Sequence, residues 1–349
     1  MKKTLIASSL FVATFILSGC SLSGVGSATN TMTNATVIKS EDSGGTWNPK
    51  INIDAKKTIA GIDVLSMAIN PNNPSVIYIG TDSSGLFMTK NEGETWTQVA
   101  FANKVYGLAF DPQNPDVMYG SGVNNERAKI YKRIQEDQEW KEIYTEPSNG
   151  TTISSFAIDK TNSQIIYAGT SEGVIIKSTD GGQTWTSLKK ASGPVVSIGF
   201  DAANNSHVFF GIFQIGVLET KDGGATIDDI TKNIDAVGNT ASIYTLVADP
   251  YLPGVVYIGT GNGIFHRSAD GVWSALNIIE SSKAFPVRAI AVNPKNSKEI
   301  IYSSAKAIYK SIDSGSKWAT FQLGTKKEIS ALRYDPGNTA KIYAGLRSF

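Results

Sequence analysis

Carboxylates are the groups of this sequence best suited to chemistry, because a facing pair of them can supply the acid and the base that glycosidic cleavage requires. Among the acidic residues, Asp82 opens the four-residue bend 82–85 (DSSG) between two apolar-rich runs. The sequence offers no recognisable second carboxylate to act with it. Because Asp is also a common turn former, we expect Asp82 to shape the bend, with catalysis as the alternative.

We do not recognise in the sequence the residue patterns that other catalytic chemistries require. The two histidines, His207 and His266, stand near neither a Cys nor an acidic cluster with metal spacing, so we expect no metal site. We find no nucleophile elbow and no phosphate-binding glycine loop, and therefore expect no cofactor. Lys and Arg number 32 against 31 Asp and Glu, and this net charge of +1 gives no electrostatic reason to bind nucleic acid.

A repeated phrase places polar and acidic residues at regular intervals. Its fullest copy is residues 178–185 (STDGGQTW), and other copies occupy 40–47, 89–96, 220–227 and 311–318, with a shortened one at 268–273. The third residue can accept hydrogen bonds from turn amides, and a nearby glycine tolerates a positive φ. We therefore expect a structural role in turns for Asp42, Asn91, Asp180, Asp222, Asp270 and Asp313.

A second phrase runs in step with the first: an Asn or Asp, in most copies followed by Pro, ahead of a β-rich run. It begins at Asn70, Asp111, Asp159, Asp201, Asp249, Asn293 and Asp335. Successive copies are 41 to 48 residues apart, which is the length of one four-stranded propeller blade. Each repeat contains four short runs typical of antiparallel strands.

Each end of the chain carries half a blade. The aspartate turn at 40–47 has no hairpin before it, and the hairpin at 329–345 has no aspartate turn after it. Pairing of these two halves would remove exposed sheet edges. The sequence therefore predicts an all-β, seven-bladed β-propeller over residues 37–349, closed by pairing of the N- and C-terminal strands.

The N-terminal 36 residues resemble an export signal followed by a tether. Lys2 and Lys3 precede the apolar run 5–17, which is too short for a comfortable membrane span. Residues 17–20 (LSGC) resemble the lipobox of bacterial lipoproteins, which implies a signal peptide over 1–19 and a lipid on Cys20, the only cysteine. An ordinary secretory signal with an incidental cysteine is the alternative. Segment 20–36, rich in small and polar residues, predicts a flexible tether.

The lipobox also implies a location. It places the protein outside the cytoplasm, in the cell envelope, lipid-anchored to a bacterial membrane through Cys20. With a single cysteine, no disulfide can form within the chain. We therefore expect the domain to be held by its apolar core and strand ladders alone.

The two repeated phrases resemble those of the Asp-box, or BNR-repeat, propellers. The likeness covers residues 37–349; it is nearest to sortilin-type domains and family 74 glycoside hydrolases, and more distant from the photosystem II assembly factor. It implies the propeller fold, but this scaffold carries hydrolases, receptors and assembly chaperones alike. Residues 78–87 (YIGTDSSGLF) resemble the family 74 segment that holds one of two catalytic aspartates, although Gly80 and Ser84 depart from its arginine and glycine.

By analogy with related propellers, we expect a ligand around the central axis, on the face that holds the blade-to-blade links. Candidate contacts are Asp82, Tyr106, Glu126, Arg127, Glu172, Phe213, Gln214, Tyr244, Asn262, Phe285 and Arg288. We expect a binding or assembly module for an unknown protein or glycan. The alternative is a glycoside hydrolase-like enzyme acting on β-glucans or related glycans, which would need two facing acids.

Overall fold

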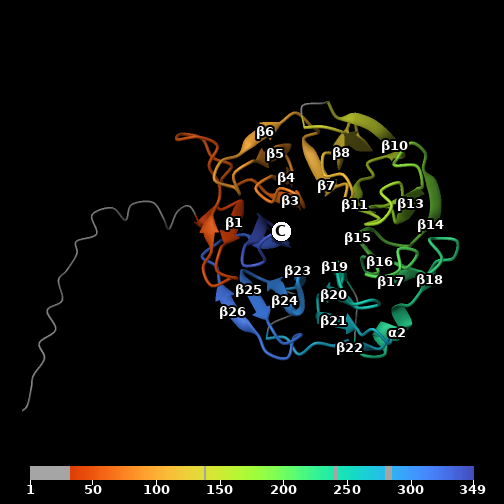
Figure 1. Cartoon of the computed structure of the whole chain (residues 1–349). Helices are drawn as coiled ribbons and strands as arrows, with labels where there is room; N and C mark the ends of the chain where they lie inside the picture. The colour runs from red at the N-terminus through yellow and green to blue at the C-terminus, as the bar shows by residue number, and fades with distance from the viewer. Residues whose placement is uncertain (1–31, 137–138, 239–241, 280–284) are drawn as a thin grey trace, which may run out of the picture.

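The fold is a ring of sheets around one axis. The computed structural model describes residues 32–136, 139–238, 242–279 and 285–349, which form seven four-stranded antiparallel sheets (Figure 1). The predicted all-β, seven-bladed propeller is confirmed. Within these residues no helix is long and apolar enough to cross a membrane, and the short helix α2 (Thr231–Asp235) lies in the link between two blades.

Six blades follow the chain, each starting at its innermost strand. Their strands are, in blade 1, β3 (Val64–Ile69), β4 (Ile77–Thr81), β5 (Leu86–Thr89) and β6 (Thr97–Val99); in blade 2, β7 (Lys104–Phe110), β8 (Met118–Asn124), β9 (Arg127–Arg133) and β10 (Lys141–Asn149); in blade 3, β11 (Ile153–Ile158), β12 (Ile166–Thr170), β13 (Val174–Ser178) and β14 (Thr186–Lys190). Blade 4 has β15 (Val195–Phe200), β16 (Val208–Ile212), β17 (Gly216–Thr220) and β18 (Asp228–Asp229); blade 5 has β19 (Ile243–Ala248), β20 (Val256–Thr260), β21 (Gly263–Arg267) and β22 (Trp273–Ala275); blade 6 has β23 (Val287–Asn293), β24 (Asn296–Ser304), β25 (Ala307–Ser311) and β26 (Ala319–Gln322).

The seventh blade joins the two ends of the chain. Its inner strands are β27 (Glu328–Tyr334) and β28 (Ile342–Arg347), and its outer strands are β1 (Val37–Ser40) and β2 (Asn48–Pro49). Val37 pairs with Gly345 in the β1–β28 ladder. The predicted closure by the terminal strands is confirmed, and the closing blade has four paired strands like the other six.

An ion-pair cluster ties this closing blade to blade 1. The buried Lys39 of β1 places its Nζ 2.7 Å from Glu92 Oε2, and Lys341 reaches the other oxygen of the same carboxylate at 2.7 Å. Glu92 therefore bridges the N-terminal strand and the C-terminal hairpin. These bonds hold the pKa of Glu92 below its usual value, despite the opposing effect of partial burial.

The packed domain begins before residue 37, inside the segment for which we predicted a tether. Ala35 and Thr36 are fully buried. The Thr36 hydroxyl donates to Ile62 O at 3.0 Å, and the backbone carbonyl of Thr36 accepts from Leu346 N at 2.9 Å. The prediction was wrong for these last residues because a small polar side chain can be buried once both its hydrogen-bonding groups are paired.

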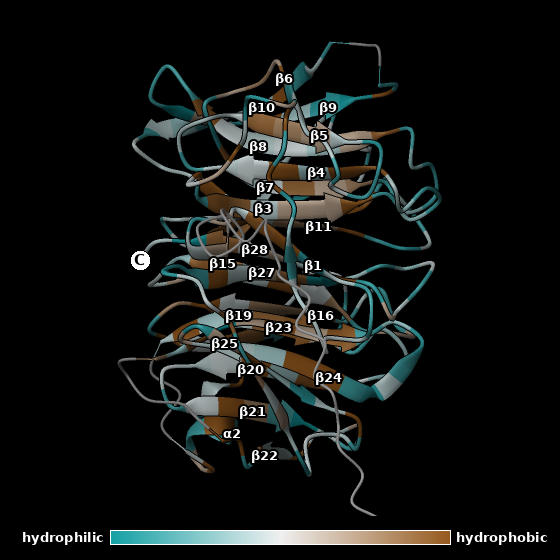
Figure 2. Ribbon diagram, turned by 90° about the vertical axis from the view of Figure 1, so that its left-hand side faces the viewer, coloured by the Kyte–Doolittle hydropathy of each residue, from teal (hydrophilic) through white to brown (hydrophobic). Residues whose placement is uncertain are grey.

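The two ends of the blades differ. The Asp/Asn hairpins and the aspartate turns lie together at one end, as in blade 3, where Gly181 N donates to Gln164 O at 2.9 Å. We call this end the turn face. The links between blades and the bends between second and third strands lie at the opposite end, which we call the mouth face. Figure 2 shows the strands, apolar along much of their length, running between these two faces.

Each innermost strand carries a β-bulge at the same position. In blade 1, Val64 pairs with Thr81 and Ser66 with Gly80, which leaves Leu65 without a partner. A bulge twists the strand and re-aims the side chain of the extra residue. The equivalent unpaired residues are Leu65, Tyr106, Ser154, Val196, Tyr244, Arg288 and Ser330.

Next to the bulge, neighbouring blades approach too closely for a side chain. A Cβ on Gly259 would lie 2.5 Å from the carbonyl oxygen of Val287 in the next blade, and one on Gly169 would lie 2.4 Å from Val195 Cβ. Hydroxyls complete the junction, since Ser66 Oγ donates to Val105 O at 3.1 Å and Ser330 Oγ to Val64 O at 2.8 Å. The glycine in the second strands IYIGT (β4), IYAGT (β12) and VYIGT (β20) is therefore explained by blade-to-blade packing.

Adding one methyl group at this junction is expected to destabilise the ring. Gly259→Ala should lower the free energy of unfolding by about 1–3 kcal/mol, because backbone must move to admit the new Cβ. Gly324→Ala is the matched control, since its Cβ would meet nothing nearer than Met32 Cγ at 3.8 Å. Urea denaturation measures both, and equal stability of the two variants would contradict the packing explanation.

Candidate functional site

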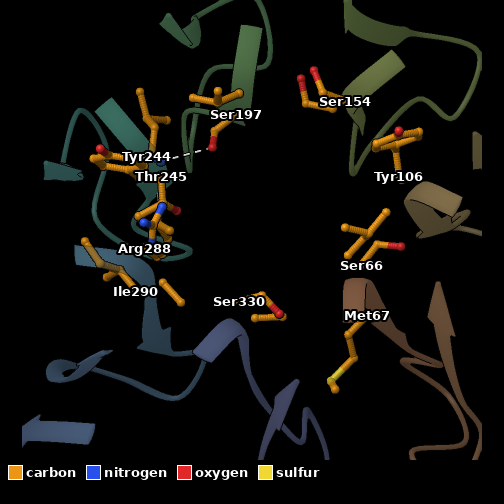
Figure 3. A pocket seen from close by; sticks show the side chains of 18 of the residues that line it. Ser66, Met67, Tyr106, Ser154, Ser197, Tyr244, Thr245, Arg288, Ile290 and Ser330 are labelled. Carbon is orange, nitrogen blue, oxygen red and sulfur yellow. Dashed lines mark hydrogen bonds between the residues drawn. The ribbon is translucent and has the colours of Figure 1, made fainter. Parts of the chain in front are cut away.

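A channel runs along the propeller axis, and its polar end opens on the mouth face. The cavity there, about 420 Å³ in volume, is lined by residues of all seven innermost strands. Figure 3 shows its side chains arranged in a ring around an open centre, with Tyr106, Ser154, Tyr244, Arg288 and Ser330 among them. We call it the mouth cavity. The inner-strand bulges supply its first ring of side chains.

Three arginines give the mouth cavity its charge. Arg288, Arg333 and Arg347 line it, and its lining residues include no Asp or Glu. Arg288 is partly neutralised, because its Nε lies 3.0 Å from Glu328 Oε2. No carboxylate of a described residue forms an ion pair with Arg333 or Arg347. A low-dielectric wall around unpaired cations focuses a positive potential into the cavity.

Arg333 marks the waist of the channel. It lines the mouth cavity and also a second cavity of about 620 Å³ on the turn face. Solvent reaches its guanidinium through the channel, yet protein atoms surround it, and this desolvation lowers its pKa from the usual value. Arg333 Nη1 donates to Leu332 O at 2.8 Å. The remaining guanidinium donors face the channel and could bind an anion.

The turn-face cavity has a different character. Its rim consists of prolines from the Asp/Asn hairpins, and its floor is aliphatic: Pro71, Pro112, Pro250, Pro294 and Pro336 surround Met67, Leu108, Ile198 and Ile290. The two ends of one channel therefore offer distinct surfaces, polar and cationic at the mouth face and apolar at the turn face.

The structure brings together only some of the predicted contact residues. Tyr106, Tyr244 and Arg288 line the mouth cavity, and Phe213 packs edge-on against Tyr244 at 5.5 Å between ring centroids. The others do not line it: six lie at bends between second and third strands, one strand farther from the axis, and Phe285 lies in the link before β23. These residues are Asp82, Glu126, Arg127, Glu172, Gln214, Asn262 and Phe285.

Asp82 does not act as the expected turn former. The hydroxyl of Thr81 accepts from Ser84 N at 3.0 Å and donates to Gly85 O at 2.7 Å, so Thr81 holds the bend. The Asp82 carboxylate instead faces Lys104 Nζ at 3.8 Å. Our expectation was wrong because the buried threonine already saturates the backbone groups that an aspartate would bind.

Asp63 is an acidic residue joined to Asp82 by a backbone hydrogen bond, in which Asp82 N donates to Asp63 O. Its carboxylate is bound by Lys327 at 2.8 Å. Partial burial works to raise the pKa of Asp63, but the hydrogen bonds from Lys327 and Ser348 outweigh it and hold that pKa below its usual value. A general acid for glycosidic cleavage needs the opposite shift.

The repeated aspartates lie on the turn face, away from the mouth cavity. Asp180 Oδ1 accepts from Thr184 N at 2.9 Å, and the Thr184 hydroxyl donates to Oδ2 at 2.5 Å. These bonds lower the pKa of Asp180 to about 2. Asp42, Asn91, Asp222 and Asp313 accept the equivalent backbone bond, whereas Asp270 in the shortened turn has a weaker one at 3.5 Å.

Among the described residues, no group of three or more His, Cys, Asp and Glu could hold a metal ion. His207 does lie between two carboxylates, with Nδ1 3.5 Å from Asp201 and Nε2 3.1 Å from Glu219. Because these acids lie on opposite edges of the imidazole, their oxygens do not converge on one point. Cys20 lies outside the described residues.

Several lining residues were missed at the sequence level, above all Arg333, Arg347, Phe349 and the hydroxyls of Ser66, Ser197 and Thr245. A signal for some of them exists. At its first or second residue, every innermost strand starts a run of Val or Ile, a variable residue, a small residue and a large apolar one, as in residues 64–67 (VLSM) and 243–246 (IYTL). The variable position is the bulge, so this seven-fold pattern marks the first ring of the cavity.

The chain is similar to several known proteins. The family model described as sortilin, neurotensin receptor 3 (Sortilin-Vps10) matches residues 35–138. A xyloglucanase from Paenibacillus sp. is 26% identical over 252 residues, which cover 68% of this chain but only 23% of that protein. The chain thus spans less than a quarter of that relative's length.

Solved structures share the fold. The GH74 xyloglucanase from Xanthomonas campestris superposes with a TM-score of 0.70 and 14% identity, covering 82% of this chain and 51% of that one. The structure of YCF48 bound to D1 peptide gives a TM-score of 0.61 and 14% identity, covering 82% of this chain and 93% of that one. The sequence-level resemblance to sortilin-type, family 74 and assembly-factor propellers is confirmed, and at these identities it defines a shared fold.

Proposed function

We propose that this protein is a binding module that takes an acidic polypeptide segment into the mouth cavity. The observation that carries the proposal is the charge of the lining: three arginines and no carboxylate. Guanidinium groups match carboxylates in shape and can bind them through two parallel hydrogen bonds. Tyr106 and Tyr244 add apolar faces with polar tips, a combination common at protein interfaces.

A polypeptide suits the cavity better than a sugar chain. The chain's own Phe349 already lies at the mouth against Arg288, so the site accommodates backbone with an aromatic side chain. Its volume of about 420 Å³ suffices for a few residues. Peptide binding is within reach of the fold, since YCF48, with which this chain shares the fold, has been solved bound to D1 peptide.

The lipid anchor that the sequence predicts would set the orientation of the site. The described chain begins on the mouth face, where Thr33 O accepts from Lys326 N in the link before β27. Eleven residues separate Cys20 from Met32, and even fully extended they span only about 40 Å. An extracytoplasmic, lipid-anchored protein would therefore hold its mouth within reach of acidic segments at the membrane surface.

A glycoside hydrolase-like enzyme is the second candidate, because the Paenibacillus relative is a xyloglucanase. Against it stands the chemistry of the acids near the mouth. Asp82 faces a lysine, and the pKa of Asp63 is lowered, whereas glycosidic cleavage needs one protonated and one ionised carboxyl facing the substrate. The binding proposal therefore has the stronger support.

Binding of an acidic peptide tests the proposal. Fluorescein-labelled hexaglutamate should bind the protein, and the Arg333→Gln/Arg347→Gln double variant should bind it at least tenfold more weakly, because each charged hydrogen bond contributes about 1.5–3 kcal/mol. The control removes two exposed lysines of the turn face, Lys298→Gln/Lys317→Gln, and should bind like the unmodified protein. Fluorescence anisotropy measures all three.

Two results would contradict this proposal. The first is equal affinity for hexaglutamate in the arginine and lysine double variants, which would indicate general surface attraction. The second is release of reducing ends from xyloglucan or another β-glucan that disappears in a folded Asp82→Ala variant, which would favour the hydrolase. We expect no such release.

The anchor has its own test. Cys20→Ser should move the protein from the membrane fraction to the soluble envelope fraction or leave its signal uncleaved, because no other cysteine can take the lipid. Fractionation followed by mass spectrometry of the N-terminus distinguishes these forms. Unchanged membrane association with normal processing would count against lipidation.

A further inference from the structure

The two residues that follow β28 turn back over the mouth cavity. We call residues 348–349 the covering segment. Ser348 donates to Asp63 Oδ1 from its backbone N–H at 3.1 Å and from its hydroxyl at 3.3 Å. This tether places Phe349 in the lining of the mouth cavity, beside Arg347. Figure 1 shows the C-terminal end of the chain lying near the centre of the ring.

Phe349 lies directly against Arg288, which is held by an ion pair with Glu328. The Arg288 guanidinium carbon is 3.8 Å from the Phe349 ring centroid and 4.8 Å from that of Tyr244, while its Nε is held by Glu328. Arg347 lies 5.1 Å from the same Phe349 ring. Attraction between cations and the ring face therefore places this side chain.

The covering segment is held weakly. Phe349 remains 59% exposed, so little apolar burial secures it. Its hydrogen bonds run through one neighbour, Ser348, to one oxygen of Asp63. That carboxylate is itself bound to Lys327 and would stay paired if Ser348 left. Removing the segment from the mouth would thus leave no buried charge without a partner.

We propose that Phe349 is an internal ligand that covers Arg288, and that an external ligand must displace it. This inference rests on the proposed function and deepens it. The subsite between Arg288 and Arg347 accepts a planar aromatic ring, and the same guanidinium groups can pair with a carboxylate once the ring has left. The external ligand is therefore a polypeptide segment with an aromatic side chain beside an acidic group.

N-acetyl-L-phenylalanine is a suitable probe, because it carries one aromatic ring and one carboxylate. The Phe349→Ala variant should bind it at least tenfold more tightly than the unmodified protein, as followed by ligand-observed NMR titration. Phe285→Ala is the matched control: Phe285 is also exposed but does not line the cavity, and its variant should behave like the unmodified protein. Adding Arg288→Met to Phe349→Ala should abolish the gain while the circular dichroism spectrum stays unchanged.

Equal affinity of the unmodified protein and Phe349→Ala would overturn the inference, and so would an absence of binding to either. A second variant guards against a local defect: Asp63→Asn, which weakens the Ser348 tether, should raise affinity for the probe in the same direction. The outcome of this test can be distinguished from the outcome of the test of the proposed function. Failure of hexaglutamate to bind any variant, with the N-acetyl-phenylalanine gain intact, would refute the acidic-segment proposal and leave the internal ligand standing.

Discussion

The close approach of neighbouring blades at the axis is the constraint on which the rest of the structure depends. At Gly259 and Gly169 the next blade leaves no room for a Cβ, so glycine is required inside a buried strand where its flexibility would otherwise be unfavourable. The carbonyl freed by each bulge is then available to hydroxyls such as those of Ser66 and Ser330. Neighbouring blades meet in this way around the ring, with Ser121 and Ser303 at the equivalent position in blades 2 and 6, and the clasp between β1 and β28 completes the last blade.

The same junction creates the site. A bulge turns one residue of each innermost strand out of the ladder and toward the channel, and the residue type at this position differs between blades. Tyr106, Tyr244 and Arg288 occupy such positions, and the next residue of each strand is small. The residue that lines the channel and the small residue at the junction between blades are thus adjacent in the strand. This separation accounts for how one propeller scaffold carries different ligands.

The repeats made the fold predictable, because hairpin, glycine and aspartate turn recur at the length of a blade and each has a local physical cause. Analogy with related propellers predicted the mouth face and three of the residues that line its cavity, Tyr106, Tyr244 and Arg288. Arg333, Arg347 and Phe349 could not be found in this way. Arg333 lies within β27, and Arg347 and Phe349 lie at and just after the end of β28, so only the tertiary fold brings them to the axis. Thr36 and Asp82 were misjudged for a related reason: the partners that decide their roles are distant in sequence or already occupied.

Hydrogen–deuterium exchange of the full protein with and without saturating hexaglutamate tests most directly whether ligands enter the mouth cavity. The protein should show slower exchange in peptides covering the starts of the innermost strands, around residues 106, 244, 288 and 330, and in the link that holds Lys327. Amides of the aspartate turns on the opposite face, such as those around Asp180, should exchange at unchanged rates. Protection confined to the turn face, or spread evenly over the surface, would contradict a binding site at the mouth.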